Sequence, residues 1–403
     1  MSFKINTPIG VLVLSTLSYL VNFIDRAILN ILFAPIKNEF HFSDLELAIL
    51  SSTSFIIFYS VLSIYSGRLA DKLSNKNLAA IGILIWCTAT GLIYFTTGFY
   101  SIAICRIFVG IGQALFFPSV IAILSNSFEE SKRGTAIGIF SMSIAVGAGI
   151  SYLAGGVIAE NFGWRNVFLF LGFPGIIFTF LFFMVEENKK ENKNKIESVN
   201  IFRLLKSKRF IFHLIGYAFF AVNSNSLLIW MPTYFMRVEN YTLSEAGKLI
   251  GILLIIFGGT GTILGGFLAD KFNKNKNFGR MLYSGILSLS SLFFWIGLLF
   301  SESPVIKITS LAILVFILFG WFGAAVSDLS KIFPIHQIGI ATGIYLFVIN
   351  ILGNGIAPPL YGAINDYFFN ASNPNTIIYS LLLSPISAII SSVFLIFGSK
   401  LKD

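Results

Sequence analysis

Ionisable side chains inside long apolar stretches are the residues of this sequence most able to do chemistry. Asn22, Asp25 and Arg26 are spaced i, i+3 and i+4, so a helix would present them on one face. Arg106 and Gln113 would share a second helical face. An acid that can change protonation beside a fixed cation is the minimum requirement for proton-linked handling of an anion. We therefore predict Asp25 as the proton-coupling residue and the other four as substrate-binding residues. A purely structural pairing of Asp25 with either arginine is the alternative.

The second half of the chain offers amides, and both halves offer aromatic rings. Asn223 lies within an apolar stretch, and Asn350 and Asn354 are spaced i, i+4. Such amides either bond between helices or contact a ligand, and the sequence leaves both open. Phe117 and Trp230 could line a pocket for an amphiphile. In a chain with 44 Phe, however, aromatic rings that face lipid or the core are the ordinary case. We name all five as substrate-binding candidates.

The composition excludes a water-soluble globule. Of 403 residues, 56% are hydrophobic and 12% are charged, against about 25% charged in ordinary soluble domains. The mean hydropathy is +0.82. Cys87 and Cys105 both lie in apolar stretches, and the three histidines share no metal-ligand spacing. We expect no metal site and no cofactor.

Twelve stretches are long and apolar enough to cross a bilayer, which takes about 20 residues each. Their length and continuity favour helices over barrel strands, which alternate over about ten residues. The first stretch carries Asp25 and Arg26, so we interpret it as a helix and not as a cleaved signal peptide. The sequence predicts an all-α integral membrane protein with spans at 8–33, 46–67, 78–96, 98–125, 133–159, 164–185, 210–235, 244–269, 279–299, 306–332, 337–363 and 374–398.

The distribution of positive charge predicts the orientation. With the N-terminus inside, 21 Lys and Arg fall in inner segments and 5 in outer segments, as the positive-inside rule requires. Both termini are then cytoplasmic. The same distribution explains the formal net charge of +9 without a nucleic-acid partner. Richness in Ile, Lys, Asn and Phe is typical of AT-rich coding DNA, which points to a bacterial inner membrane.

A polar stretch at 186–209 divides the spans six and six. We interpret it as a cytoplasmic linker between an N-terminal half, 1–185, and a C-terminal half, 210–403. A regulatory or partner-binding role for the linker is the alternative. The halves are internal repeats, because the segment that begins at Gly67 with the letters GRLADK recurs 199 residues later at Gly266 as GFLADK. Two pseudo-symmetric six-helix halves are the organisation of transporters that rock one half against the other.

The repeated G-x-L-A-D-K segment, together with R-x-x-x-G-x-G from Arg106, resembles the signatures of the major facilitator superfamily over the whole chain. The resemblance implies a monomeric transporter with a small-molecule substrate in a lipid membrane. It also assigns Gly67, Asp71, Arg133 and Asp270 to a cytoplasmic gate, with glycines at close helix contacts and Arg133 as the partner of Asp71. Interface charges that only fix topology are the alternative. Asp328, near the inner end of its span, fits a gate or topology role better than substrate contact.

Three segments narrow the resemblance: N-F-I-D-R from Asn22, the stretch that follows Arg106, and the stretch from Trp230 to Gly247. They resemble the spinster branch, which implies a lysolipid-type amphiphilic anion as cargo and protons as the coupling ion. The anion:cation symporter branch, which takes up small organic acids, shares N-x-x-D-R and is the alternative. Both branches usually carry a glutamate where this chain has Gln113. A relay between two carboxylates is therefore excluded, and either Asp25 alone couples to protons or transport is facilitative.

Other classes of protein fit poorly. The sequence has no catalytic triad, H-E-x-x-H motif or phosphate-binding loop, so neither an enzyme nor an ATP-driven pump is expected. A transport-inactive sensor would need an added soluble domain, for which we expect no room at either terminus.

Overall fold

The computed structural model describes residues 5–186, 204–275, 278–368 and 373–401, and it confirms an all-α membrane protein. Twelve helical stretches within this part of the chain are long and apolar enough to span a bilayer. They agree with the predicted spans to within a few residues at most ends. Their bounds are Pro8–Ile31, Asp44–Ser63, Asn75–Phe95, Phe99–Ser127, Thr135–Phe162, Trp164–Phe183, Lys208–Arg237, Leu243–Lys274, Gly279–Phe300, Pro304–Ile332, Gln337–Phe368 and Thr376–Lys400.

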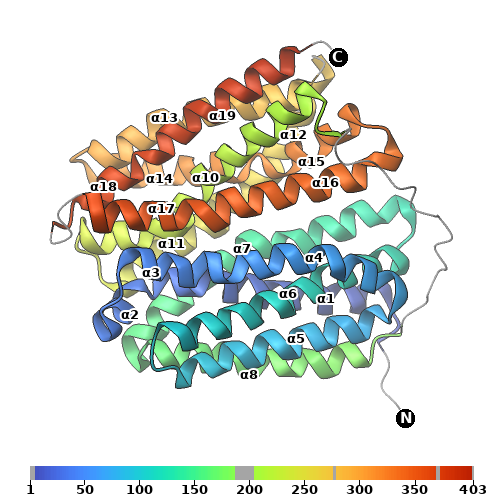
Figure 1. Cartoon of the computed structure of the whole chain (residues 1–403), viewed down its shortest axis with the longest axis horizontal. Helices are drawn as coiled ribbons and strands as arrows, with labels where there is room; N and C mark the ends of the chain where they lie inside the picture. Colours follow the sequence, from blue (N-terminus) through green and yellow to red (C-terminus); the bar gives the residue numbers. More distant parts are fainter. Residues whose placement is uncertain (1–4, 187–203, 276–277, 369–372, 402–403) are drawn as a thin grey trace. The chain divides into compact units, whose positions relative to one another are not determined.

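The chain forms two compact units (Figure 1). The first unit comprises Met1–Asn194 and Asn240–Gly251. Its elements are α1 (Pro8–Ile31), α2 (Phe33–Phe40), α3 (Asp44–Ala48), η1 (Ile49–Thr53), α4 (Ser54–Lys72), α5 (Asn75–Leu92), η2 (Ile93–Phe95), α6 (Phe99–Ser127), α7 (Glu130–Phe162), α8 (Trp164–Phe183) and most of α11 (Leu243–Leu253).

The second unit comprises Lys195–Glu239 and Ile252–Asp403. Its elements are α10 (Lys208–Arg237), η3 (Leu254–Gly258), α12 (Gly259–Asn275), α13 (Gly279–Phe300), α14 (Pro304–Phe319), α15 (Phe322–Ile332), α16 (Ile335–Ile349), η4 (Asn350–Ile356), α17 (Ala357–Ala363), η5 (Ile364–Phe368), α18 (Thr376–Leu381) and α19 (Leu383–Lys400).

Glycine contacts bring α4, α5 and α6 close together. A Cβ atom placed on Gly112 of α6 would lie 2.5 Å from the carbonyl oxygen of Gly82 on α5. A Cβ atom on Gly110 would lie 2.6 Å from the carbonyl oxygen of Phe55 on α4. Small residues permit such approach between membrane helices, where packing replaces the hydrophobic effect as the driving force. These contacts fix the position of α6, which carries three of the predicted site residues, Arg106, Gln113 and Phe117.

Gly67 and Gly266, the glycines expected at close helix contacts, have open space where a Cβ atom would lie. No described atom lies within 4 Å of a Cβ atom placed on either glycine. A Cβ atom placed on Gly323 of α15 would nevertheless lie 4.0 Å from the Cα atom of Gly266, so α15 approaches α12 at this glycine. The gate role of Gly67 and Gly266 stays a prediction.

Four π-helical segments interrupt spans that the sequence predicted as continuous α-helices. They are η1, η3, η4 and η5. A π turn bonds residue i to i+5, so carbonyl groups around it lose their usual α-helical partners. Hydropathy does not distinguish a π turn from an α turn, because it depends on which residues a segment contains and not on how their backbones are hydrogen-bonded.

An ion pair joins two polar segments of the first unit. Glu39, at the end of α2, accepts a hydrogen bond of 2.7 Å from the indole nitrogen of Trp164 and is ion-paired with Arg165. The hydrogen bond from Arg165 is the main reason that the pKa of Glu39 lies below its usual value. Gly163, at a φ of +85°, turns the chain into α8 immediately before these two donors.

Gly112→Ala is expected to destabilise the protein. The new methyl group would meet the Gly82 carbonyl oxygen at 2.5 Å and the backbone nitrogen of Trp86 at 2.7 Å. Overpacking of this kind costs about 1–3 kcal/mol. The thermal unfolding midpoint of the purified protein in detergent should fall. Gly138→Ala is the matched control, because no described atom lies within 4 Å of a Cβ atom there. Equal midpoints for the two variants would contradict the close contact of α5 with α6.

Candidate substrate and proton site

Asp25 lies in the interior of α1 and is 1% exposed. Its carboxylate accepts a hydrogen bond of 2.9 Å from the Thr90 hydroxyl on α5 and one of 3.3 Å from the Gln113 amide on α6. Three helices therefore converge on one acid. Thr90 was not predicted as a site residue, although a threonine in an otherwise apolar stretch could have indicated one.

Gln113 connects the acid to a cation. Its Nε2 donates to Asp25, while its Oε1 accepts a hydrogen bond of 2.7 Å from Nε of Arg26. Because an amide has one donating and one accepting end, Gln113 can satisfy the carboxylate and the guanidinium at the same time. The structure thus brings together Asp25, Arg26 and Gln113, which the sequence placed on two separate helical faces.

Aromatic rings surround the guanidinium of Arg26. Its Cζ atom lies 5.0 Å from the ring centre of Phe23, 4.9 Å from that of Phe55 and 4.4 Å from that of Tyr59. Each contact is within cation–π range. Within the described residues, the two terminal nitrogens of Arg26 make no hydrogen bond, so donors remain for a ligand. Phe55 and Tyr59 were missed, although their i, i+4 spacing marks one face of the second span.

Arg106 is fully buried and is held by backbone carbonyl groups. Its Nε donates to the carbonyl oxygen of Leu50 at 3.2 Å, and its Nη2 donates to that of Ser51 at 2.9 Å. A longer contact of 3.5 Å reaches the backbone oxygen of Asp25. Leu50 and Ser51 lie in the π-helical segment η1, where carbonyl groups are not all used within the helix. Arg106 therefore uses its hydrogen-bond donors for groups inside the protein.

No direct contact among the described residues supports the alternative that Asp25 is a structural salt-bridge partner. In the described part of the chain, neither Arg26 nor Arg106 forms an ion pair with Asp25 within 4 Å. Both positive charges nevertheless act on the carboxylate through space. This arrangement leaves the carboxylate free to change protonation without breaking an ion pair.

Two further predicted residues line the same region of the first unit. Asn22 is 1% exposed, and its side-chain oxygen has no hydrogen-bond partner among the described residues. Phe117 is half-buried and packs against Tyr19 and Phe140, with ring centres 5.6 and 6.2 Å apart. The unpaired oxygen of Asn22 is a polar contact available to a ligand, whereas Phe117 belongs to an aromatic cluster.

The predicted residues of the second unit are largely engaged in its own packing. Asn223 is fully buried, donates to Ser291 at 3.0 Å and accepts from the Trp295 indole nitrogen at 2.7 Å. This is the interhelical alternative that the sequence left open. Trp230 is fully buried in α10. Asn354 donates to Asn350 at 3.3 Å within the π-helical segment η4, and both side chains are half-buried.

The predicted gate residues do not all fall within the described side chains. The side chain of Asp71 lies outside the described part of the structure, so its pairing with Arg133 stays a prediction. Arg133 donates to the backbone oxygen of Phe128 at 3.1 Å. Asp270 is paired with Arg280 at 2.7 Å. Asp328, which was predicted from its position near the inner end of its span to have a gate or topology role, is 0% exposed.

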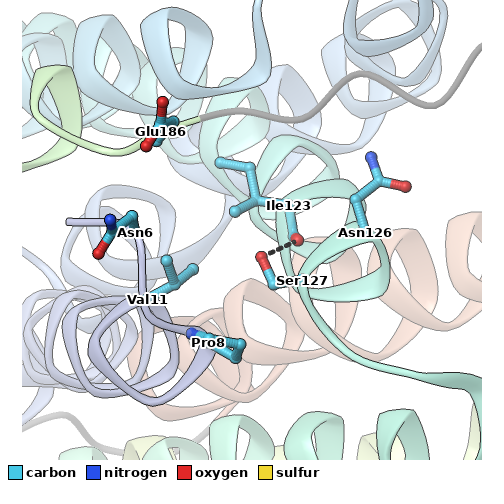
Figure 2. Close-up of a pocket in the computed structure, with 7 residues that line it drawn as sticks. All are labelled: Asn6, Pro8, Val11, Ile123, Asn126, Ser127 and Glu186. Atoms are coloured by element: carbon cyan, nitrogen blue, oxygen red, sulfur yellow. Dashed lines mark hydrogen bonds between the residues drawn. The ribbon is translucent and has the colours of Figure 1, made fainter. Parts of the chain in front are cut away.

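A small polar pocket of about 120 Å³ lies between the start of α1 and the end of α6, beside Glu186. Figure 2 shows Asn6 and Asn126 on opposite sides of it, with Ser127 donating to the Ile123 carbonyl oxygen at 2.8 Å. Ligand pockets usually measure about 300–1,000 Å³. The pocket is too small for a cargo molecule and includes none of the predicted site residues.

Comparisons with known proteins agree on one family. A family model described as Major Facilitator Superfamily matches residues 15–358. A protein of Arabidopsis thaliana named as a probable sphingolipid transporter, spinster homolog 1, is 24% identical over 86% of this chain and 77% of its own. The hexuronate transporter of Bacillus subtilis is 25% identical over 87% of this chain and 86% of its own. A crystal structure of a bacterial homologue of the human lysosomal transporter spinster has the same fold, with a TM-score of 0.85 and 22% identity over 98% of this chain and 97% of that one.

Thr90→Val is expected to destabilise the protein, because it removes one of the two hydrogen bonds to a buried carboxylate. The expected cost is about 1–3 kcal/mol. Thr179→Val is the matched control, since the hydroxyl of Thr179 is buried and has no hydrogen-bond partner in the described residues. Thermal unfolding in detergent should therefore show a lower midpoint for Thr90→Val alone. If both variants lose stability equally, the Thr90 hydroxyl is not holding Asp25.

Proposed function

The chain belongs to the major facilitator superfamily, and from that premise we propose that it is a secondary active transporter that works by alternating access. In this proposal it moves an amphiphilic organic anion, in exchange or symport with protons. The cargo class is of the lysolipid type. The related proteins are named as transporters, and the twelve apolar helices make this chain a multi-pass membrane protein.

The proposal rests mainly on the free hydrogen-bond donors and the aromatic surroundings of Arg26. Its Nε is bonded to Gln113, three aromatic rings surround it, and its terminal nitrogens keep free donors. A planar guanidinium with free donors can bind a carboxylate or phosphate through two parallel hydrogen bonds. The surrounding rings suit the apolar part of an amphiphile. Asn22, Arg106, Phe117, Asn223, Trp230, Asn350 and Asn354 complete the proposed substrate-binding set, with Arg106 acting mainly as a support for η1.

Asp25 is the proposed proton-coupling residue. Its carboxylate is buried, accepts hydrogen bonds from two neutral donors and makes no ion pair with a described residue. A buried ionisable group in a membrane is costly and is usually retained for function. Gln113 relays the state of the acid to Arg26, because any rotation of its amide alters both hydrogen bonds. Protonation of Asp25 and anion binding at Arg26 are therefore coupled in the proposal.

The runner-up function is uptake of a small organic acid, for which the similarity to a hexuronate transporter is the supporting observation. A free guanidinium would serve a sugar acid as well as a lipid phosphate. The aromatic surroundings of Arg26 favour the amphiphile. A facilitator without proton coupling is the second alternative, because Gln113 replaces the usual glutamate.

The remaining elements of the proposal concern location and gating. We place both termini in the cytoplasm and the protein in a bacterial inner membrane as a monomer, on the distribution of Lys and Arg and on composition. Gly67, Asp71, Arg133, Asp270 and Asp328 are the proposed cytoplasmic gate. The Asp270–Arg280 pair supports this assignment in the second unit.

Arg26 variants test the anion site. Arg26→Lys keeps the charge but loses the planar fork, so affinity should fall about tenfold. Arg26→Ala should lower it by 100-fold or more, since truncation of a charged partner costs about 2–5 kcal/mol. Binding of a lysophosphatidate and of a hexuronate to purified protein, measured by calorimetry, also separates the two cargo classes. Arg165→Lys, which changes an arginine paired with Glu39 elsewhere in the unit, is the control. Unchanged affinity for both probes in Arg26→Ala would remove Arg26 from the site.

Coupling is tested by accumulation in proteoliposomes. With an imposed proton gradient the parent protein should concentrate its substrate, whereas Asp25→Asn should exchange substrate without concentrating it. Gln113→Glu adds a second carboxylate and should steepen the pH dependence of transport. Suppose that the parent ignores the gradient and Asp25→Asn accumulates substrate equally well. The protein is then a facilitator, and Asp25 has a structural role.

A further inference from the structure

The second unit contains a deeply buried acid. Asp328 of α15 is 0% exposed, and neither of its carboxylate oxygens has a hydrogen-bond partner among the described residues. Buried polar groups are almost always hydrogen-bonded, and burial of an unpaired carboxylate is especially costly. An acid that is retained under these conditions has to carry a proton or acquire a cation.

Aromatic side chains from neighbouring helices lie close to Asp328. His213 and Tyr217 of α10 and Tyr345 of α16 form a cluster in which the histidine ring lies 4.7 and 5.2 Å from the two tyrosine rings. Both tyrosines interact electrostatically with Asp328. The Tyr217 hydroxyl donates to Ser284 at 3.0 Å, and it also acts favourably on the charge of the Asp328 carboxylate.

His213 is also incompletely bonded. Its Nε2 contacts the carbonyl oxygen of Ala325 at 2.9 Å, so that nitrogen carries the hydrogen. Its Nδ1 is buried and has no partner among the described residues. Ala325 lies on α15, one helical turn before Asp328. His213 of α10 therefore contacts α15 one turn from the acid and has a basic nitrogen without a hydrogen-bond partner in the described structure.

Two cations act on Asp328 through space, and both are engaged elsewhere. Arg280 of α13 contacts Asp270 of α12 through Nε at 2.8 Å and Nη2 at 2.7 Å. Lys331 of α15 bonds to Asn273. Asp270 is 61% exposed, so it remains well solvated with or without Arg280. Arg280 therefore has a hydrated partner in this structure and a buried alternative partner.

We propose that Asp328 is a proton-binding residue of the second unit, and that its proton is exchanged against the guanidinium of Arg280. In the state described, Asp270 is paired with Arg280 and Asp328 carries a proton. The net charge of the three groups is then zero. When Arg280 moves to Asp328, the O–H bond of the acid breaks and one proton passes to water. Asp270 then remains as a solvated carboxylate, and the three groups sum to one negative charge.

This inference rests on the proposed transport function only in giving the proton a role in the transport cycle. Proton binding itself is measurable without cargo or membrane gradient. Failure of Asp25 to couple in proteoliposomes would leave the Asp328 site untouched, and failure at Asp328 would leave the Asp25 proposal untouched.

Infrared difference spectroscopy between acidic and alkaline pH tests the site directly. A protonated carboxylic acid has a C=O stretching band that the carboxylate lacks, and aspartate labelled with carbon-13 at the side-chain carboxyl shifts the band of an aspartic acid. Asp328→Asn should remove one such band from the purified protein in detergent. Asp25→Asn should leave that band in place. Asp270→Asn deprives Arg280 of its present partner and should weaken the band at neutral pH, as Arg280 turns to Asp328.

Stability provides the second readout. Asn is close to a neutral aspartic acid in shape and charge, so Asp328→Asn should unfold at a temperature no lower than the parent protein. Removing one member of a buried ion pair costs about 3–5 kcal/mol, so a marked loss of stability would show that Asp328 is an ionised structural partner. An unchanged set of carboxylic acid bands in Asp328→Asn would equally overturn the proposal.

Discussion

The amide of Gln113 is the contact on which the candidate site depends. One side chain on α6 donates to Asp25 and accepts from Arg26, so a neutral group holds an acid and a base that are neighbours on α1. The contact requires α6 to lie close to α1, α4 and α5. Glycines 82, 110 and 112 make that approach possible. The same packing brings Arg106 to the carbonyl groups of η1, which anchors the second span to α6.

Hydropathy and charge were enough to predict the fold. The twelve spans and the resemblance to the major facilitator superfamily are both confirmed, because bilayer thickness and the repeated G-x-L-A-D-K segment leave little freedom. The choice of partners within the bundle was less predictable. The sequence placed Asp25, Arg26 and Gln113 on inward faces, but helical spacing does not reveal rotations between helices. Thr90, Phe55 and Tyr59 were therefore missed, and Asn223 and Arg106 proved to be engaged within the protein.

The two units handle buried charge differently. In the first unit, Asp25 receives donors from two other helices and two arginines act on it. In the second unit, Asp328 lies among tyrosines and a histidine, with its nearest cations engaged by other partners. An internal repeat predicts matching backbones but not matching chemistry. Sequence position placed Asp328 near the inner end of a span but could not show that the packing of α10, α13 and α16 around α15 buries it completely.

The π turn of η1 has a consequence for how this chain aligns with its relatives. A π turn holds one residue more than an α turn, and one residue corresponds to about 100° of rotation around a helix. The residues after Thr53 are therefore rotated around the helix axis as if one residue had been inserted into a regular α-helix. Phe55 and Tyr59 point toward Arg26 in that phase. A relative whose second span is wholly α-helical needs a one-residue gap at Ile49–Thr53 to align correctly. Without the gap, every downstream position of α4 would be compared with a residue on the wrong face.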